Sequence, residues 1–258
     1  MDVCVRRRVQ LSWRIAAGRV TRHFRPGLEM NRVIEPELLD ELSPDDPRAR
    51  WSRCDLRRIN TWMRNHRIMA NALQSAVNGY RPQRIVDLGA GDGHLMLRVA
   101  RRTAPRWQNV NVTLLDRQEV TDTRTLTSFR SMGWRVETVE MDLFDWVSKA
   151  GELDVVVANL FLHHFEDSRL VELFRVLANH ARVFVAIEPR RAPWPLFCCH
   201  LLWAIGCNSV TRHDAAISVR AGFSNNELSR LWPGDKDWQL RERRTGFFSH
   251  LFAARRTG

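Results

Sequence analysis

The segment from Arg84 to His94 limits, more than any other, the structures that this chain can adopt. It begins as a short apolar run, passes through Asp87-Leu88-Gly89-Ala90-Gly91-Asp92-Gly93 and enters a helix-like pattern. Glycines at such a turn permit positive φ and let a ligand approach bare backbone. The first amides of the following helix are unpaired donors. The segment therefore predicts a buried strand, a glycine turn and a helix start that together bind a nucleotide-like ligand.

The spacing of the glycines separates two classes of cofactor. The dinucleotide fingerprint, G-x-G-x-x-G/A, requires a small third residue that packs the helix against the strand. Counted from Gly89 this position is His94, and counted from Gly91 it is Met96. The turn instead has the spacing G-x-G-x-G, with an acid two residues before the first glycine. The nicotinamide fingerprint is therefore excluded.

Strand-like and helix-like segments alternate from about residue 83, which indicates βαβ units and a parallel sheet. Short apolar runs such as 155–157 are typical of strands covered on both faces. The expected strands are 84–88, 110–116, 134–142, 153–160, 181–188, 238–243 and 247–253. The expected helices are 55–77, 94–102, 119–132, 167–180, 214–221 and 225–231. The pattern predicts an α/β fold.

Three regions follow from this pattern. Residues 30–82 are expected to form an N-terminal helical cap, and residues 83–258 the main domain, with a substrate-side insertion at about 190–232. Residues 1–29 form a basic leader with seven arginines and two acidic residues. An Arg-rich, acid-poor leader is typical of organelle transit peptides, but the alternative that translation starts at Met30 is the one we favour.

The charge of the chain is a weak guide to its partners. The formal net charge is +11, which favours nucleic acid or an acidic membrane as a partner. Lysine occurs only at positions 149 and 236, so arginine supplies nearly all of the positive charge. An excess confined to arginine is also explained by codon bias, so basicity alone does not indicate nucleic-acid binding.

The five cysteines argue against a disulfide framework or a zinc site. Their number is odd, Cys198 and Cys199 are adjacent, and no pair has a CxxC spacing. The sequence therefore predicts no metal site and a reducing, cytoplasmic location. No apolar run reaches the length of about 18 residues that a membrane-spanning helix needs.

Polar residues stand at the ends of three further expected strands. Asp116 ends the second strand, Asp142 the third and Asn159 the fourth. Ligands in open α/β sheets bind at the carboxyl ends of strands. Each residue alone has a plain explanation, as a helix cap or a solvated loop residue. Their occurrence together, in register with the glycine turn, predicts one binding site.

This acid-x-G-x-G-x-G turn and the strand-end residues resemble the motifs of class I S-adenosylmethionine-dependent methyltransferases. The resemblance covers about residues 83 to 190 and implies a Rossmann-like, seven-stranded, mostly parallel sheet with helices on both faces. It implies S-adenosyl-L-methionine as cofactor, with Asp116 on the ribose, Asp142 beside the adenine and Asn159 bordering the methyl group. The cofactor-binding residues that it implies are Asp87, Gly89, Ala90, Gly91, Gly93, Asp116, Arg117, Asp142, Leu143 and Asn159.

Two histidines are candidates for a catalytic base. His163 and His164 follow the fourth strand, and the resemblance places His163 near the methyl group; a role in orienting the loop is equally compatible. His213 lies between the fifth and sixth strands, where the family often inserts substrate-recognition elements. The plain alternative for this segment is a structural one, in which Thr211 or Asp214 caps the following helix.

The acceptor is expected to be a small molecule. The chain is similar to ubiquinone/menaquinone-type methyltransferases and to those encoded beside type III polyketide synthases, which implies O- or C-methylation of a phenolic, quinone-like or polyketide-derived acceptor. The segment from Trp194 to Trp203 is apolar, and three roles are open to it: lining a lipophilic pocket, packing in the core, or contacting a membrane surface. The segment at 57–60 is a further candidate for covering the cofactor.

Two alternatives differ in class. A nucleic-acid (RNA) methyltransferase would grip a flipped base with an Asn/Asp-Pro-Pro-aromatic turn, whereas this chain has Asn159-Leu160-Phe161-Leu162, without prolines. A non-catalytic binding protein of the same fold is the second alternative. It is disfavoured because the acid and the three glycines of the turn, together with Asp116, are all present.

Overall fold

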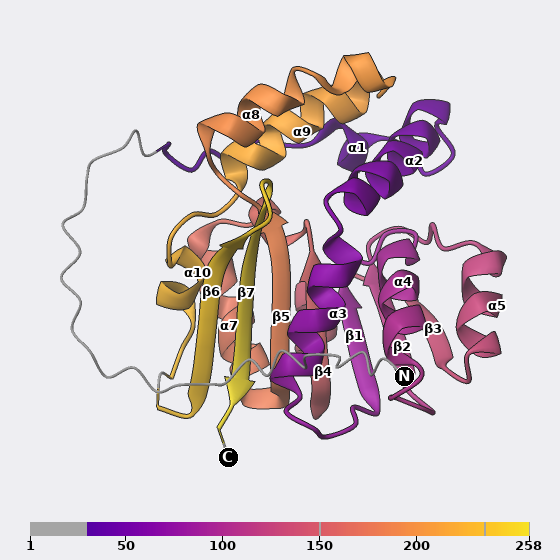
Figure 1. The fold of residues 1–258 in the computed structure, drawn as a ribbon, viewed down its shortest axis with the longest axis vertical. Coiled ribbons are helices and arrows are strands. Elements are labelled where there is room, and N and C mark those ends of the chain that lie inside the picture. The colour runs from indigo at the N-terminus through magenta and orange to yellow at the C-terminus, as the bar shows by residue number, and fades with distance from the viewer. Residues whose placement is uncertain (1–29, 150, 235, 258) are drawn as a thin grey trace, which may run out of the picture.

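The computed structural model describes residues 30–149, 151–234 and 236–257, so the basic leader lies outside the described residues. Seven strands form one sheet in the order β3-β2-β1-β4-β5-β7-β6 (Figure 1). The first five strands are parallel, while β7 runs antiparallel to β5 and to β6. The predicted seven-stranded, mostly parallel sheet is confirmed. The strands are β1 (Arg84–Leu88), β2 (Asn111–Asp116), β3 (Arg135–Glu140), β4 (Leu153–Asn159), β5 (Ala181–Pro189), β6 (Trp238–Thr245) and β7 (Ser249–Arg256).

The central strands are buried on both faces. Val155 and Val157 of β4 belong to one buried apolar cluster, whereas Val156 belongs to the other. This alternation follows from the two-residue period of a strand. It explains why the apolar run of β4 shows no polar position.

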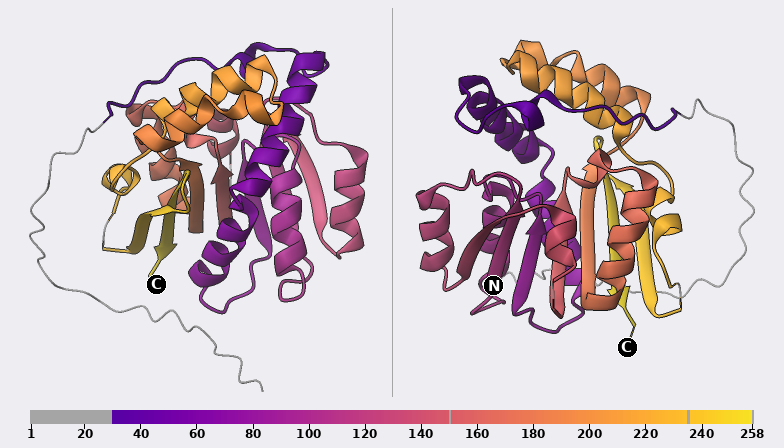
Figure 2. Two further views of the ribbon diagram at one scale, coloured as in Figure 1. Left: turned by 45° about the horizontal axis from the view of Figure 1, so that its top comes forward. Right: turned by 180° about the vertical axis from the view of Figure 1, so that it is seen from behind.

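Helices cover both faces of the sheet, as the sequence predicts (Figure 2). One apolar cluster receives side chains from α3 (Asn65–Ala76), α4 (His94–Thr103) and α5 (Thr123–Ser131). The other receives side chains from α6 (Leu143–Val147), α7 (Asp167–His180) and α10 (Glu227–Leu231).

A separate helical layer lies above the carboxyl ends of the parallel strands, at the top of Figure 1. We call it the cap. Two segments far apart in sequence build it, and α9 packs against helices of both. The members are α1 (Leu38–Glu41), α2 (Pro47–Trp62), α8 (Pro193–Cys199), the 3-10 turn η2 (Leu202–Ile205) and α9 (Ser209–Ala221). A second 3-10 turn, η1 (Leu162–His164), follows β4 at the edge of the sheet below the cap. The α3 helix, although N-terminal, packs on the sheet instead.

Buried carboxylates join the two segments of the cap. Asp214 of α9 accepts hydrogen bonds from the Leu38 and Leu39 amides at 2.9 and 3.0 Å. Asp55 of α2 accepts the Asn208 amide at 2.9 Å and the Thr211 hydroxyl at 3.2 Å. Each carboxylate thus satisfies amides at a helix start that no backbone carbonyl can reach.

Several helices differ from their expected bounds, and two of them begin five residues or more before the expected start. The helix expected at 55–77 is two helices, because Arg64 adopts a left-handed conformation with φ 58° and ends the first. The first of them begins at Pro47, a residue suited to the first helical turn. The helix expected at 214–221 begins at Ser209, because Asn208 caps it by accepting the Thr211 amide at 2.8 Å. Neither Thr211 nor Asp214 is its cap.

A cluster of aromatic rings packs between α7 and the sheet, and substitution of its central residue tests how much this packing stabilises the fold. Phe174 is fully buried and contacts the rings of Phe184, Trp232 and Phe252. Phe174→Ala should lower the free energy of unfolding by about 3–5 kcal/mol, because it leaves a cavity among these rings. Urea unfolding followed by circular dichroism measures the change.

Trp203→Ala is the matched control, since Trp203 is 65% exposed. Its effect should stay within about 0.5 kcal/mol. Equal losses in the two variants would contradict the packing described here.

Candidate active site

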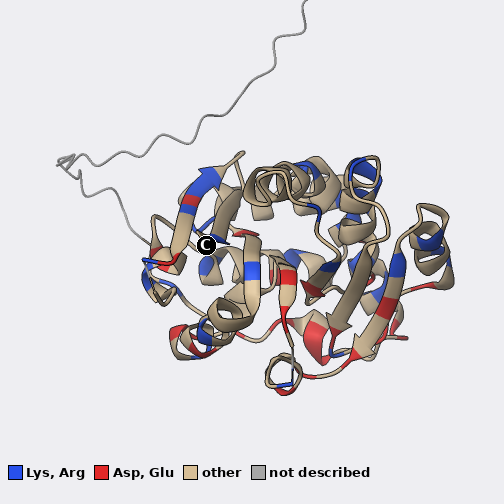
Figure 3. Cartoon of the chain, turned by 90° about the horizontal axis from the view of Figure 1, so that it is seen from below, with Lys and Arg blue, Asp and Glu red and all other residues tan. Residues whose placement is uncertain are grey.

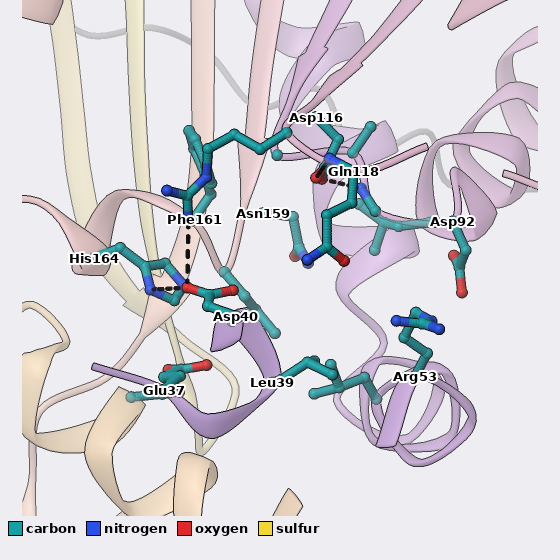
Figure 4. Close-up of a pocket in the computed structure, with 18 of the residues that line it drawn as sticks. Glu37, Leu39, Asp40, Arg53, Asp92, Asp116, Gln118, Asn159, Phe161 and His164 are labelled. Carbon is teal, nitrogen blue, oxygen red and sulfur yellow. Dashed lines mark hydrogen bonds and ion pairs between the residues drawn. The ribbon is translucent and has the colours of Figure 1, made fainter. Parts of the chain in front are cut away.

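A cavity of about 850 Å³ lies between the cap and the carboxyl ends of β1, β2 and β4. Its walls come from the glycine turn, the strand ends, α1 and α2 (Figure 4). Nine of the residues predicted for the site line it: Gly89, Ala90, Gly91, Asp116, Arg117, Asp142, Leu143, Asn159 and His163. Asp87, Gly93 and His213 do not.

The three glycines of the turn all have positive φ, but they serve different contacts. At Gly91 a β-carbon would meet nothing within 4 Å, so this backbone faces open cavity. At Gly93 it would approach the Leu114 side chain to 2.7 Å, and at Gly89 it would collide with the ring of Phe161. Gly91 therefore leaves room for a ligand, whereas Gly89 and Gly93 leave room for neighbouring side chains.

Asp116 is tied to the glycine turn. Its carboxylate accepts the Gly91 amide at 2.7 Å and the Gln118 amide at 3.0 Å. The side chain still borders the cavity, because it leaves the end of β2 directly opposite the turn. The strand-end acid is thus placed where its oxygens can also meet a hydroxyl-bearing ligand.

The other strand-end residues have local partners as well. Asp142 caps α6, since it accepts the Phe144 amide at 2.8 Å. Arg117 lies 3.8 Å from Asp40 of α1, which brings the cap toward the end of β2. Both residues line the cavity.

A buried amide network fixes Asn159 at the floor of the cavity. The fully buried Asn65 donates to Asn159 Oδ1 at 3.1 Å and to Asn60 at 2.9 Å. Asn65 in turn accepts the Ser249 hydroxyl at 3.0 Å. Since Asn65 occupies the oxygen of Asn159, the amide nitrogen of Asn159 is directed toward Asn60 at 3.3 Å.

The cap contacts the glycine turn through the helix that contains the segment 57–60. Arg57 of α2 forms an ion pair with Asp92. Figure 4 shows Arg53 of the same helix directed at Asp92, and Asn60 also lines the cavity. The segment predicted to cover the cofactor thus lies over the turn.

His163 is held between two carboxylates. Its Nδ1 lies 2.8 Å from Glu188 and its Nε2 lies 3.2 Å from Glu37. Burial alone would lower the pKa of His163, but the hydrogen bonds to Glu188 and Glu37 outweigh it and raise the pKa to about 9. With both ring nitrogens occupied, His163 offers no free lone pair to an acceptor. This geometry favours orientation of the loop over a role as base.

Glu188 is the residue that organises this loop. It is fully buried at the end of β5 and accepts the backbone amides of Phe161, Leu162 and His163 at 3.2, 3.0 and 3.3 Å. Neither Glu188 nor Glu37 was predicted from the sequence as a residue of the site. For Glu188 a signal existed, because it is an acid directly after the apolar run of β5. For Glu37 there was none.

Two predicted elements lie away from the cavity. His213 is on the outer side of α9, with its side chain 50% exposed and its Nδ1 3.0 Å from Asp214. The structure therefore does not bring it to the site. The segment from Trp194 to Trp203 does not line the cavity either. Its exposed side chains lie along α8 and η2: Trp194, Phe197, Leu201 and Trp203.

The buried carboxyl group of Asp87 makes the stability of the folded protein depend on pH. Burial first, and then the charges of Asp116 and Asp92, raise its pKa to about 8. Its pKa in the unfolded chain is about 3.9. The unfolded chain therefore releases this proton first, and the carboxyl should reduce stability progressively as the pH rises from about 4 to about 8.

Asp87→Asn removes this titration. The free energy of unfolding of the variant relative to wild type should increase between pH 5 and pH 8 by more than about 1.4 kcal/mol, which corresponds to one pKa unit. Urea unfolding at the two pH values measures it. Asp145→Asn, at an exposed position of α6, should show no such increase, and a pH-independent difference for Asp87→Asn would refute the assignment.

Comparisons with known proteins agree with this geometry. Residues 85–183 match the family model described as a methyltransferase domain. The plantazolicin methyltransferase BpumL, solved in complex with SAH, matches 82% of this chain and 91% of its own at a TM-score of 0.60 and 13% identity. The mitomycin 7-O-methyltransferase MmcR matches 85% of this chain and 60% of its own, at a TM-score of 0.54 and 20% identity. No curated relative matches the chain. Residues 85–183 therefore match a methyltransferase domain, and the chain has the Rossmann-like fold of these two structures.

Proposed function

We propose that the protein transfers a methyl group from S-adenosyl-L-methionine to a small-molecule acceptor that is phenolic, quinone-like or polyketide-derived. The observation that carries this proposal is the continuity of the cavity. One space extends from the glycine turn and Asp116 to Phe161 and His164 beneath α1. Its volume of about 850 Å³ is near the upper end of ordinary ligand sites, roughly 300–1,000 Å³. A cofactor and a small acceptor can share it.

The residues at one end of the cavity fit the cofactor. The open space at Gly91 admits a ligand against the backbone, and the Asp116 carboxylate is a suitable acceptor for two ribose hydroxyls. Met141 and Leu143 give an apolar wall beside Asp142, which fits an adenine ring. BpumL, whose fold this chain shares, was solved with SAH. Asp87 and Gly93 would act from beneath, by shaping the turn.

The cofactor supplies a methyl group activated on a sulfonium. The remaining task of the protein is to align an acceptor atom with that group and to exclude water. Asn159, fixed by Asn65, borders the middle of the cavity and would hold the two ligands in register. The cap closes the site from above, since α1 and α2 form part of its wall.

The other end of the cavity fits a lipophilic acceptor. Apolar side chains from the cap and from the loop after β4 surround it, among them Ile34, Leu39, Phe161 and Phe165. The carboxylate of Asp40 and the ring of His164 lie in the same wall, 3.5 Å apart. An acceptor hydroxyl placed here would meet groups that can receive its proton.

Contact with a membrane surface is a further part of this proposal. It is supported by the exposed apolar side chains of the segment that forms α8 and η2 in the cap. In the described part of the chain no helix is long and apolar enough to cross a bilayer. Acidic and basic residues are interspersed over the underside of the fold (Figure 3), so no basic stripe suited to nucleic acid is seen there.

Asp116→Asn tests the cofactor site. Loss of the negative charge should weaken the binding of S-adenosylhomocysteine by about tenfold or more, because hydrogen bonds to charged groups contribute about 1.5–3 kcal/mol. Isothermal titration calorimetry measures the affinity. Asp145→Asn should bind as wild type does, and unchanged affinity in Asp116→Asn would rule out the ribose assignment.

The reaction itself is tested with labelled S-adenosylmethionine and a panel of phenols, hydroquinones and polyketide-type resorcinols. We expect a mass increase of one methyl group in at least one acceptor class, dependent on the enzyme. Binding of S-adenosylhomocysteine without methylation of any small-molecule class, but with methylation of RNA, would overturn the proposal.

A further inference from the structure

Three potential metal ligands converge at the acceptor end of the cavity. Glu37, His163 and His164 each place one ligand atom so that all three lie within 4.8 Å of one another. Glu37 precedes α1 in the cap, whereas the two histidines belong to η1 at the end of β4. The cluster thus joins the cap to the sheet, and all three residues line the cavity.

We propose that these three side chains bind a divalent first-row transition-metal ion. Two imidazoles and one carboxylate form a set that such ions use when they keep open coordination positions for other ligands. No cysteine of the described residues lines the cavity, so the proposed ligand set contains no thiolate.

The distance between two of the ligand atoms already fits shared coordination. Two atoms bound at about 2.0–2.2 Å to one ion are roughly 3.0–3.5 Å apart when they are neighbours around it. His163 Nε2 and Glu37 Oε1 lie 3.2 Å apart. The rings of His163 and His164 lie with their centroids 4.3 Å apart and tilted by 33°, and the ligand atom of His164 lies within 4.8 Å of the other two.

The surroundings of His163 are those of a metal-bound histidine. Such a histidine usually donates its other ring N–H to a carboxylate, which fixes its tautomer. Here Glu188 has this role, at 2.8 Å from Nδ1. Glu188 itself accepts three backbone amides, which fix the position of its carboxylate. In the metal-bound form Nδ1 would keep its proton for Glu188, and Nε2, which faces Glu37, would bind the ion in place of a proton.

The local charge also favours a cation. The carboxylates of Glu37, Glu188 and Asp40 surround two imidazoles, and Asp40 lies 3.5 Å from His164 Nδ1. Two guanidinium groups lie near this cluster without pairing with Glu37 or Glu188. Arg32 pairs with Asp167 and donates to the carbonyl oxygens of Phe165 and His163. Arg117 Nη2 lies 3.8 Å from Asp40 Oδ2, the oxygen that also faces His164 Nδ1.

A metal ion at this position would have a direct use in the proposed reaction, and this part of the inference rests on the proposed function. With its open positions facing the cavity, the ion would hold the oxygen of an acceptor hydroxyl and lower its pKa. The proton would pass to the Asp40 carboxylate, which lies beside the cluster. Glu37, His163 and His164 would then determine which acceptor oxygen faces the cofactor.

The plain alternative is a proton in place of the ion, with His163 bridging Glu37 and Glu188 as an imidazolium. Metal binding by the full chain separates the two. We would strip the protein with a chelator and titrate it with Co²⁺ by calorimetry, while its absorption spectrum reports the ligand type. We expect one equivalent of Co²⁺ to bind without a thiolate charge-transfer band.

Variants locate the site. Glu37→Gln and His164→Ala should each weaken Co²⁺ binding by at least tenfold, since each removes one ligand. Both positions are partly exposed, with side-chain exposures of 11% and 23%, so folding should be retained and is checked by urea unfolding. His200→Ala removes an exposed histidine outside the cavity and should bind as wild type.

Absence of stoichiometric binding, or binding that neither Glu37→Gln nor His164→Ala weakens, would overturn the metal site. The affinity for S-adenosylhomocysteine, measured on the same samples, keeps the two proposals apart. Cofactor binding without Co²⁺ binding refutes only the metal site. Co²⁺ binding that depends on these residues, without cofactor binding, supports the metal site and counts against the proposed function.

Discussion

The buried carboxylate of Glu188 is the interaction on which the arrangement of the site depends. A fully buried charge is tolerated only when it is paired and hydrogen-bonded. Glu188 meets this requirement by taking three consecutive backbone amides and the ring of His163. It thereby fixes the loop after β4, and through His163 and Glu37 it also fixes the first residues of the cap.

The cap and the sheet together make the site, since neither encloses the cavity alone. Asp55 and Asp214 hold the two segments of the cap to each other, and the ion pair of Arg57 with Asp92 joins the cap to the glycine turn. The cavity therefore has a rigid floor of strand ends and a roof built from helices. Such a division suits methyl transfer, in which alignment and exclusion of water matter more than strong acid–base catalysis.

Local pattern was enough to predict the sheet and most of the residues that line the glycine-turn end of the cavity. Asp116 and Asn159 stand at strand ends, and the topology of a parallel sheet brings strand ends to one edge. Roles that depend on distant packing were not predictable in this way. The lack of a side chain at Gly89 makes room for the Phe161 ring, and His213 lies half-exposed beside Asp214 on α9.

The contact of Glu37 with His163 could not be predicted from the sequence, because it too depends on distant packing. It reaches His163 across 126 positions of the chain, and nothing near it in sequence indicates a binding site. Long-range contacts of this kind are set by how the cap docks, which the periodicity of single helices does not specify. The break at Arg64, which separates α2 in the cap from α3 on the sheet, was missed for this reason too.

The central claim is that the glycine-turn end of this cavity binds the cofactor. Hydrogen–deuterium exchange with and without S-adenosylhomocysteine tests it most directly, because it reports on each backbone segment of the unmodified protein. The account predicts slower exchange at residues 89–95 and 115–118, and in α1 and α2 of the cap. Unchanged exchange at these segments under saturating ligand, or protection confined to other parts of the fold, would contradict it.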